Sequence, residues 1–452
     1  MYDLINPATG AVFRSIEMTT ADGVDAAVAR ARAAFPAWRD VAPADRARLL
    51  RRFAELVDTN GEDLARTEVE NAGHTIGNAR WEAGNVRDVL TYYAAAPERL
   101  FGRQIPVAGG LDLTVAEPLG VVGVIVPWNF PMPIAAWGFA PALAAGNTVV
   151  LKPAETTPLT ALRLAELGLE AGLPEGVLQV VPGFGPEAGA RLVEHPDVRK
   201  IVFTGSSAVG RAIMARCAEQ VKRVTLELGG KSPNIVFADA DVEKAAAAAP
   251  YGVFDNAGQD CCARSRIYVE AAVYDAFMER FLDACRGVVV GDLLDEKTEM
   301  GPLISAAQKA RVAGFVEAVA DADIAFRGEV PDNGGFWYPP TVVTGVAPDA
   351  AIQCDEVFGP VVTVTPFASE AEVVEAANRS EYGLSGSIWT RDLSRALRVS
   401  RAVQSGNLSV NSNSSVRYST PFGGFKQSGL GRELGPDALA AFTETKNIFI
   451  AL

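Results

Sequence analysis

The stretch VVGVIVPWNFP, residues 121–131, begins as an uninterrupted apolar strand and ends in a loop bounded by two prolines. Four further apolar runs follow it, and helical patterns separate each run from the next. The runs cover residues 147–151, 177–181, 200–204 and 223–228, and the helical patterns cover residues 133–145, 157–171, 186–194 and 207–219. Val-, Ile- and Leu-rich strands that alternate with helices indicate a parallel sheet covered by helices on both faces. The predicted fold class is therefore α/β.

A second α/β pattern begins near Lys231. It predicts a strand, a helix, a strand and a helix at residues 233–237, 242–256, 265–269 and 271–287. A looser α/β region then runs to Asn411, followed by a Ser/Gly/Pro-rich loop over residues 412–435 and a short final strand over residues 447–452 that has no local core to join. On the N-terminal side, amphipathic helices are expected at residues 21–34, 43–60 and 79–95, before strand-like runs in residues 99–118.

Composition and charge exclude several classes of function. The 452 residues carry 41 basic and 55 acidic side chains, a net charge of −14, so neither a nucleic acid nor an anionic membrane is an expected partner. Residues 118–151 are uncharged, but their prolines argue against a membrane helix. Two histidines and five irregularly spaced cysteines argue against a metal site or a disulfide framework. No export signal is evident at the N-terminus, so a cytoplasmic, reducing location is expected.

The motifs that could bind a ligand follow the predicted parallel strands, at whose carboxyl ends ligands bind in such sheets. FTGSSAVG (203–210) places Gly205 and Ser206 at a helix N-terminus, which suits phosphate, although a plain helix cap explains the pattern as well. KPAE (152–155) offers Lys152 and Glu155. A glutamate bonded to a ribose 2′-hydroxyl would repel a 2′-phosphate and so favour NAD over NADP, whereas an isolated KPAE reads equally as a solvated ion pair.

Three further residues could take part in catalysis or cofactor binding. Glu227 ends an apolar strand, where partial burial would raise the pKa of a carboxylate towards that of a general base; the alternative is a structural carboxylate bonded to the following glycines. Asn129 in PWNFP is a candidate oxyanion donor or merely shapes its own turn. Glu356 in DEVFGP could hold a second ribose, with Phe358 packed on a nicotinamide ring.

The stretch FDNAGQDCCA, residues 254–263, supplies a candidate nucleophile. Gly258 permits a tight turn before Cys261 and Cys262, and backbone N–H groups beside Cys261 could stabilise an oxyanion. The alternative is that both cysteines are small buried hydrophobes. Together, a thiol, one carboxylate base, an amide donor and a nucleotide site without metal ligands suit the oxidation of an aldehyde through a covalent thioester.

Seven motifs, in order, give the chain a resemblance to the NAD(P)-dependent aldehyde dehydrogenase superfamily over nearly its whole length: PWNFP, KPAE, FTGS, LELGGKSP, NAGQDC, EVFGP and PFGGFKQSGLGRE. The resemblance implies a Rossmann-type nucleotide domain, an α/β catalytic domain and a small β oligomerisation arm. It implies that Cys261 is the nucleophile, Glu227 the base and Asn129 an oxyanion donor. The implied cofactor is NAD, with NADP less favoured, held by Pro127, Trp128, Lys152, Glu155, Gly205, Ser206, Gly229, Glu356 and Phe358.

The resemblance also implies a reaction path and an assembly. Glu227 favours release of the acid by hydrolysis, because relatives that transfer the acyl group to coenzyme A lack a glutamate there. A CoA-acylating enzyme and a non-catalytic nucleotide-binding protein remain the alternatives. The implied domains are residues 1–99 and 119–229 for NAD, with 429–442 packing back, 230–428 for catalysis, and 100–118 with 443–452 as an arm of a homodimer or homotetramer.

The substrate pocket is implied by the same resemblance. Its positions are Phe130, Ile134, Trp137, Asp255, Asp260, Val416 and Phe422. Asp255 and Asp260 could favour a cationic amino or betaine aldehyde; alternatively both face backbone or water, or Arg417 neutralises them. Aliphatic or aromatic aldehydes are favoured as a class. One departure is Gly138, because many relatives have a lysine there on a proton-exit path with a glutamate that matches Glu433, so an exit role for Glu433 is in doubt.

Overall fold

A six-stranded sheet forms the core of the first lobe. Its order is β17-β9-β8-β5-β6-β7, and every neighbouring pair is parallel except β17 with β9. The computed structural model describes residues 1–319, 322–414 and 416–452. The bounds are β5 (Val121–Ile125), β6 (Thr148–Lys152), β7 (Leu178–Val180), β8 (Val198–Thr204), β9 (Arg223–Glu227) and β17 (Gly429–Leu430). The parallel α/β prediction for this part of the chain is confirmed.

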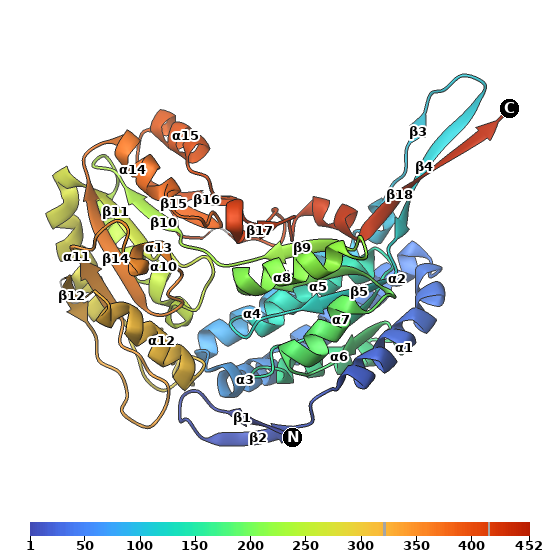
Figure 1. The fold of residues 1–452 in the computed structure, drawn as a ribbon, viewed down its shortest axis with the longest axis horizontal. Helices are drawn as coiled ribbons and strands as arrows, with labels where there is room; N and C mark the ends of the chain where they lie inside the picture. Colours follow the sequence, from blue (N-terminus) through green and yellow to red (C-terminus); the bar gives the residue numbers. More distant parts are fainter. Residues whose placement is uncertain (320–321, 415) are drawn as a thin grey trace.

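Helices cover both faces of this sheet (Figure 1). One face packs on α2 (Pro43–Thr59), α4 (Ile76–Ala94), α5 (Pro131–Ala144) and α6 (Leu159–Glu170), and the other on α1 (Ala21–Arg39), α7 (Ala190–Glu194) and α8 (Ser207–Ala218). Thr20 and Thr75 cap α1 and α4 by accepting backbone N–H bonds. The sequence pattern did not predict helix α3 (Gly61–Ala72). Only Asn60 separates it from the end of α2.

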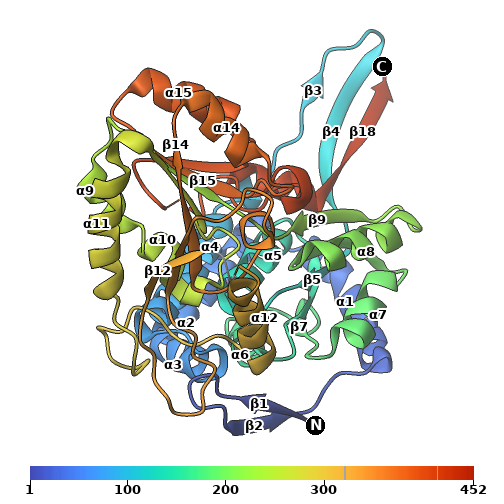
Figure 2. The same ribbon diagram turned by 60° about the vertical axis from the view of Figure 1, so that its left-hand side comes forward.

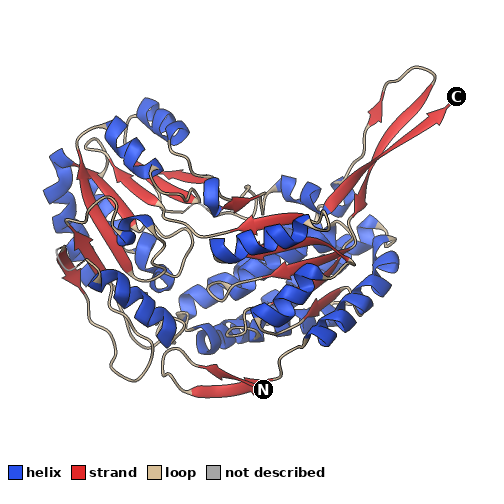
Figure 3. Ribbon diagram, in the orientation of Figure 1, coloured by secondary structure: helices blue, strands red, loops and turns tan. Residues whose placement is uncertain are grey.

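The second lobe contains a seven-stranded sheet, with strand order β12-β13-β14-β11-β10-β15-β16 (Figure 3). Only the β12–β13 pair is antiparallel among these strands. The strands are β10 (Pro233–Val236), β11 (Arg266–Glu270), β12 (Asp323–Arg327), β13 (Thr341–Thr344), β14 (Val361–Phe367), β15 (Ser385–Trp389) and β16 (Asn407–Val410). The helices are α9 (Val242–Ala248), α10 (Tyr251–Phe254), α11 (Tyr274–Arg286), α12 (Ala306–Glu317), α13 (Ala351–Cys354), α14 (Glu370–Asn378) and α15 (Leu393–Ala402).

The single helix predicted over residues 242–256 is wrong. Pro250 lies between α9 and α10, and its ring cannot continue the hydrogen-bond ladder of a helix interior. After α10 the chain turns at Asp255–Gly258, where Asn256, Ala257 and Gly258 leave the right-handed helical region. This break carries the chain out of the helix and into the turn that contains Cys261. The expected loop over residues 412–435 contains β17 and is described except for residue 415.

Two small β elements project from the lobes. An N-terminal hairpin, β1 (Tyr2–Ile5) with β2 (Val12–Ile16), was not predicted. The other is an arm of β3 (Gln104–Ile105), β4 (Gly110–Pro118) and β18 (Thr443–Ala451), which extends away from both lobes in Figures 1 and 2. The final strand is longer than predicted, and it pairs along its whole length with β4 of its own chain, from Thr443 opposite Pro118 to Ala451 opposite Gly110.

Candidate active site

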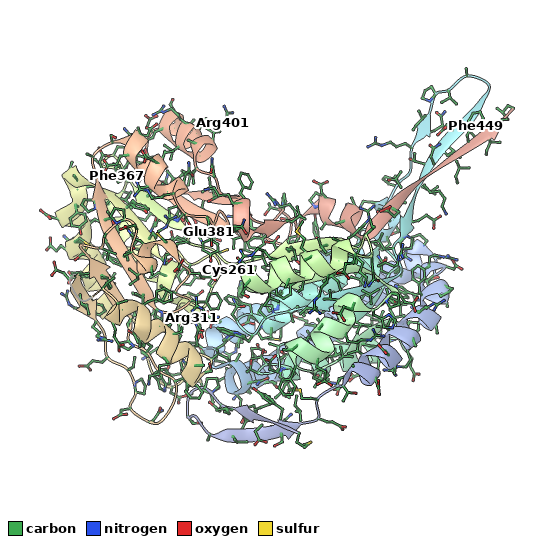
Figure 4. The ribbon with its side chains drawn as sticks, viewed as in Figure 1. Cys261, Arg311, Phe367, Glu381, Arg401 and Phe449 are labelled. Carbon is green, nitrogen blue, oxygen red and sulfur yellow. The ribbon has the colours of Figure 1, made fainter. Side chains whose placement is uncertain are left out.

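A cavity lies where the two lobes meet, at the carboxyl ends of β8 and β9 and beside the cysteine turn. Figure 4 shows Cys261 between the lobes, with Arg311 on the side of the second lobe. The lining residues come from both lobes: Pro127, Trp128, Asn129, Thr204, Gly205, Ser206, Glu227, Leu228, Gly229, Cys261, Gln308, Arg311, Glu356 and Phe358. The structure therefore brings Cys261, Glu227 and Asn129 to one cavity, with most of the residues predicted to bind the cofactor.

The cysteine turn is held in an uncommon backbone conformation. Asn256, Ala257 and Gly258 are three consecutive residues with positive φ, of 49°, 53° and 70°. A side chain at Gly258 would bring its Cβ to 2.1 Å from the Gly359 carbonyl oxygen. Residues other than glycine in this region of φ/ψ space cost of order 1 kcal/mol or more each, so the surrounding contacts must hold the turn in place. The predicted role of Gly258 in a tight turn is confirmed.

The Cys261 side chain is partly exposed to the cavity, whereas Cys262 is buried. The neighbouring Cys262 thiol, burial and the nearby Asp260 carboxylate together hold the pKa of Cys261 well above its usual range. The resting side chain is therefore a thiol, and a base or a nearby positive charge must favour the thiolate before it can attack. The reading of both cysteines as buried hydrophobes fits Cys262 but not Cys261.

Asn129 is anchored to the cysteine turn. Its Nδ2 donates to the backbone carbonyl oxygen of Gln259 at 2.9 Å. The backbone carbonyl oxygen of Asn129 accepts from Asn256 Nδ2 at 2.7 Å. One N–H of the side-chain amide is used by the first bond, and the other is left for a group in the cavity. The side chain is buried, so this geometry is fixed before any substrate binds.

Glu227 ends β9 with its carboxylate buried. Neither oxygen has a hydrogen-bond partner among the residues that the structure describes, and a Cβ on the neighbouring Gly423 would lie 2.7 Å from Oε1. Burial first, and then the neighbouring Glu433 carboxylate, raise the pKa of Glu227 well above its usual range. A buried carboxylate that lines the cavity without a partner is ready to accept a proton there.

The predicted cofactor residues surround the same cavity. Trp128 and Phe358 form an edge-to-face aromatic pair with ring centroids 5.2 Å apart. Glu356 accepts from the Gly230 N–H at 2.8 Å, and burial raises the pKa of its carboxyl to about 7. A Cβ on Gly229 would lie 2.6 Å from that carboxylate, so a larger residue there would displace the Glu356 side chain. Ser206 caps α8 by accepting from the Val209 N–H, which leaves the first N–H groups of this helix facing the cavity end of β8.

Lys152 and Glu155 lie at the end of β6 and are not among the residues that line this cavity. The Lys152 ammonium is 3.6 Å from a Glu155 carboxylate oxygen, so they form an ion pair with each other. Lys152 is buried, which lowers its pKa, while Glu155 is partly exposed. They lie at the carboxyl end of β6, which neighbours β5 in the sheet, and their role with a ribose stays a prediction.

Two aromatic pairs contain predicted pocket residues. Trp137 meets Phe422 with ring centroids 5.3 Å apart, and Phe130 meets Trp81 at 6.4 Å. Ile134 and Val416 belong to the same core, which Cys261 also contacts. Five of the seven predicted pocket residues thus belong to or pack against one large hydrophobic core, and Trp81, which no motif marked, packs on Phe130.

Two of the predicted pocket residues lie outside these aromatic pairs. Asp255 accepts from Asn78 Nδ2 at 2.6 Å and from the Asn256 N–H at 3.1 Å, and it lines a separate cavity with Tyr251. Asp260 accepts from the Cys262 N–H at 2.8 Å. Both carboxylates thus have hydrogen-bond partners within the turn or on α4, and a role for them in a cationic pocket stays a prediction. Burial raises the pKa of Asp260, and the Cys262 N–H and the positive charge of Arg264 partly offset that rise.

Four lining residues were not among the predicted site residues: Thr204 and Leu228, which lie inside motifs named above, and Gln308 and Arg311, which do not. Gln308 and Arg311 come from α12, and each donates at 2.7 Å to a backbone carbonyl of the loop that carries Glu356 and Phe358. They lie about 50 residues before that loop in the sequence, in a helix without a motif. Neither composition nor periodicity could have marked them.

The comparisons with known proteins agree with the geometry. Residues 1–448 match the model of the aldehyde dehydrogenase family. The chain belongs to this family. It is 43% identical to an aldehyde dehydrogenase of Emericella nidulans over 100% of its own length and 92% of that protein. It is 44% identical to a phenylacetaldehyde dehydrogenase of Pseudomonas fluorescens, over 99% of this chain and 92% of that one.

A solved structure gives the same result for the fold. The NAD⁺ complex of an aldehyde dehydrogenase from Bacillus cereus superposes with a TM-score of 0.97 at 41% identity, over 100% of this chain and 93% of that one. The predicted fold class, with two α/β lobes and a β arm, is therefore confirmed as the aldehyde dehydrogenase fold. Among the described residues, no helix is both long enough and apolar enough to cross a bilayer.

Proposed function

We propose that Cys261, Asn129 and Glu227 carry out the NAD-dependent oxidation of an aldehyde to its carboxylic acid. The activity and the cofactor follow from family membership, and the residue roles are our assignment. The observation that carries the assignment is that one cavity is lined by a partly exposed thiol, an anchored amide and a buried carboxylate without partners.

In the first half of the reaction, the Cys261 sulfur bonds to the aldehyde carbon and its proton passes to a base in the cavity. Glu227 lines that cavity and has a raised pKa, which makes it the base for this proton. The second N–H of Asn129 and the backbone N–H of Cys261 stabilise the oxyanion that forms. Bound NAD supplies the acceptor for the hydride that leaves this carbon.

The residues at the cofactor end of the cavity fit a dinucleotide. The N-terminus of α8 offers N–H groups to a phosphate, Glu356 has a carboxylate oxygen for a ribose hydroxyl, and the Trp128–Phe358 pair offers an aromatic wall. Glu155 is our candidate for the ribose that distinguishes NAD from NADP. A Glu155→Gln variant should therefore raise the NADP/NAD ratio of kcat/KM, and an unchanged ratio would contradict this assignment.

Glu227 releases the first proton to solvent before the second half, in which water attacks the thioester while the Glu227 carboxylate accepts a proton from it. The carbon–sulfur bond breaks, the acid leaves and the Cys261 sulfur is regenerated. Hydrolysis is favoured over transfer to coenzyme A because the buried carboxylate of Glu227 is available for water. A requirement for coenzyme A in turnover would overturn this choice, and tight NAD binding without turnover of any aldehyde would favour a non-catalytic protein.

We propose apolar aldehydes, aromatic or aliphatic, as the substrate class. The aromatic pairs Trp81–Phe130 and Trp137–Phe422 form the wall behind Cys261, and Asp255 and Asp260 are already engaged by amide and backbone groups. A panel of aldehydes assayed with both cofactors tests this choice. We expect a higher kcat/KM for arylacetaldehydes than for an ω-aminoaldehyde of the same length, and the reverse order would contradict it.

We also propose that the chain forms a homodimer or homotetramer through its arm and acts in a reducing, cytoplasmic environment. Ile448, Phe449 and Ile450 on β18 are exposed, and β18 is the edge strand of the arm. All five cysteines are free, as a nucleophilic thiol requires. Light scattering of the full chain should give a dimer or larger assembly, which Phe449→Asp should weaken; a monomeric wild type would contradict the proposal. The domain boundaries at residues 99, 118, 229, 428 and 442 stay predictions.

A further inference from the structure

Two glutamates and a histidine form a buried cluster at the corner between α3 and α4. Glu68 lies on α3, His74 follows the glycine that ends this helix, and Glu82 lies on α4. Each side chain offers one possible ligand atom, and the three atoms lie within 4.8 Å of one another. All three residues are at most 3% exposed, and none of them lines the active-site cavity. The reaction described above therefore does not use them.

The two carboxylates of this corner are short of positive charge. Among residues 1–319, 322–414 and 416–452, the one ion pair to either of them joins His74 Nδ1 to Glu82. No lysine or arginine of these ranges forms an ion pair with Glu68 or Glu82. Burying a carboxylate is costly unless an opposite charge or hydrogen bonds compensate. The corner therefore needs a further positive group.

One oxygen of each carboxylate also lacks a hydrogen-bond partner. Oε1 of Glu68 and Oε2 of Glu82 are inaccessible, and neither accepts a bond from a described residue. A proton shared between His74 and Glu82 is the alternative source of positive charge. That proton would leave both of these oxygens unsatisfied, whereas a cation between the three side chains would attract both carboxylates at once.

The three ligand atoms suit a divalent metal ion that takes nitrogen and oxygen ligands. Zn²⁺ and Mn²⁺ bind imidazole together with carboxylate, and Zn²⁺ does so at about 2.0–2.2 Å. Tetrahedral ligands at that length lie about 3.4 Å apart, which fits a cluster whose atoms are within 4.8 Å of one another. An entering ion takes the place of the direct hydrogen bond between His74 and Glu82. Two carboxylates and a neutral imidazole then balance its charge.

The His74 ring is held from its other side. A histidine that binds a metal usually donates its second ring N–H to a carboxylate or a backbone carbonyl, which fixes the orientation of the ring. The His74 ring hydrogen bonds to the backbone of Asn129, and its centroid lies 5.9 Å from that of the Phe130 ring. Nδ1 is the nitrogen that faces Glu82, so Nδ1 is the nitrogen available to an ion.

A cavity adjoins the cluster at the start of α4. Its volume is about 380 Å³, and its lining includes Thr75, the residue after His74, together with Asn78 and Asp255. Solvent therefore reaches the chain next to His74. The Asp255 carboxylate accepts from Asn78 Nδ2 at 2.6 Å, so a negative charge lies on the side from which a cation would enter.

We propose that Glu68, His74 and Glu82 bind one divalent metal ion, Mn²⁺ or Zn²⁺, which joins the corner of α3 and α4. The inference goes beyond the proposed function and does not depend on the roles of Cys261 and Glu227. Counting histidines and cysteines argued against a metal site, because two of these three ligands are glutamates. They meet because Gly73, with a φ of 77°, ends α3 and turns the chain towards α4.

The test measures the binding of Mn²⁺ alone to the full chain. Protein is treated with EDTA, dialysed and incubated with Mn²⁺, and the free ion is counted from its electron paramagnetic resonance signal. We expect one bound ion per chain and a rise in Tm of at least about 2 °C at saturation. Zn²⁺ should displace the Mn²⁺, because it binds such ligands more tightly.

A second preparation covers a site that fills only as the chain folds. Protein is purified without EDTA from cells grown with added Mn²⁺, and its metal content is measured by mass spectrometry of the elements. The same stoichiometry, one ion per chain, is expected.

Substitution of single ligands locates the ion. Glu68→Gln and Glu82→Gln keep the size of the side chain but remove its charge, so each should weaken Mn²⁺ binding by at least about tenfold. Circular dichroism checks that each variant is folded, and either of them suffices for the comparison. The electron spin echo of bound Mn²⁺ should show modulation by an imidazole nitrogen, and His74→Gln should abolish it. His195 is the other histidine of the chain, and His195→Gln should leave the modulation unchanged.

Two matched controls exclude other acidic and thiol groups. Glu70 is exposed on the same helix as Glu68, and Glu70→Gln should bind Mn²⁺ as the wild type does. Asp260, Cys261 and Cys262 also place ligand atoms within 4.8 Å of one another. Cys261→Ala should nevertheless keep the full Mn²⁺ stoichiometry, because thiolates favour softer metals than Mn²⁺.

Several results would overturn the metal site. One is less than about one ion per ten chains in both preparations. Others are an affinity within twofold of the wild type in folded Glu68→Gln or Glu82→Gln, nitrogen modulation that persists in His74→Gln, and loss of binding in Cys261→Ala. None of these results bears on the oxidation of aldehydes, and an enzyme without acyl transfer to Cys261 would leave the metal site standing. Failure of this inference and failure of the proposed function are thus separate.

Discussion

Two buried clusters in the first lobe have nearly the same composition but opposite surroundings. Each contains two glutamates and a basic side chain: Glu227 and Glu433 with Lys200, and Glu68 and Glu82 with His74. In the second cluster, His74 Nδ1 is hydrogen bonded directly to Glu82, and none of the three residues lines the active-site cavity. In the first cluster, both oxygens of Glu227 lack partners and the carboxylate faces the cavity with Cys261.

A perturbed pKa therefore does not by itself mark a catalytic group. Burial raises the pKa of Glu68 to about 8 and that of Glu433 to about 8. Two carboxyls with the same shift thus have different uses, because only one cluster reaches a reacting atom. Access to the nucleophile decides the role, and the shift only makes the chemistry possible.

The largest effect is expected from a substitution at Glu227, the residue of the first cluster that lines the cavity. Glu227→Gln keeps the shape of the side chain but cannot accept a proton, so we expect hydrolysis of the acyl-enzyme to slow by about 10²–10⁴-fold. The first turnover of NADH should persist at a reduced rate. Stopped-flow absorbance at the NADH band measures both phases, and a steady-state rate close to that of the wild type would contradict the assignment.

Breaking the other cluster should affect stability more than chemistry. His74→Ala removes the partner of the buried Glu82 carboxyl, which we expect to lower the free energy of unfolding by about 1–3 kcal/mol. The kcat of the folded enzyme should fall far less than in Glu227→Gln, because His74 contacts the backbone of Asn129 and the ring of Phe130 but no reacting atom. Denaturant unfolding combined with an assay at low temperature separates the two quantities. A hundredfold loss of kcat in folded protein would show that the two clusters do not differ as described.

The pH dependence of activity sharpens the comparison further. Cys261 and Glu227 both have raised pKa values and both act in their deprotonated forms, so kcat/KM should rise as the pH increases from 6 towards about 9. The same profile is expected for His74→Ala, whose substitution lies outside the cavity. A kcat/KM that falls over this interval would contradict the identity of the nucleophile and the base.

The smallest expected effect concerns how stability depends on pH. The pKa of Glu68 is raised from 4.5 to about 8 on folding, so the folded protein binds this proton more tightly than the unfolded chain does. Its contribution is present below about pH 4 and is lost as the pH rises through 8. Glu68→Gln should therefore reduce the fall in Tm between pH 6 and pH 9, as measured by calorimetry. An unchanged slope would show that Glu68 does not titrate in this interval.

Much of the fold and the centre of the site could be predicted from local sequence. The strands from Val121 to Glu227 are continuous apolar runs, and the motifs at their ends occupy one sheet edge because parallel strands all point the same way. Gly258 and the two cysteines marked the turn because only a few residue types suit that backbone.

The rest depends on contacts between distant parts of the chain. Asp255 accepts a hydrogen bond from Asn78, 177 residues earlier. β17 returns to pair with β9, which places Gly429 opposite Glu227, and nothing in either local sequence predicts that pairing. Helix α3 was missed because it follows α2 after a single residue, so no loop composition separated the two.

The central claim is that Cys261 bonds to the carbon of the aldehyde and Glu227 releases the product. Its most direct test is the intact mass of Glu227→Gln after reaction with an excess of aldehyde and NAD and an acid quench. The account predicts an adduct on the peptide that contains Cys261, with the mass of the aldehyde less that of one hydrogen molecule, and none in Glu227→Gln that also carries Cys261→Ala. An unmodified Cys261 in protein that has formed NADH would contradict the account.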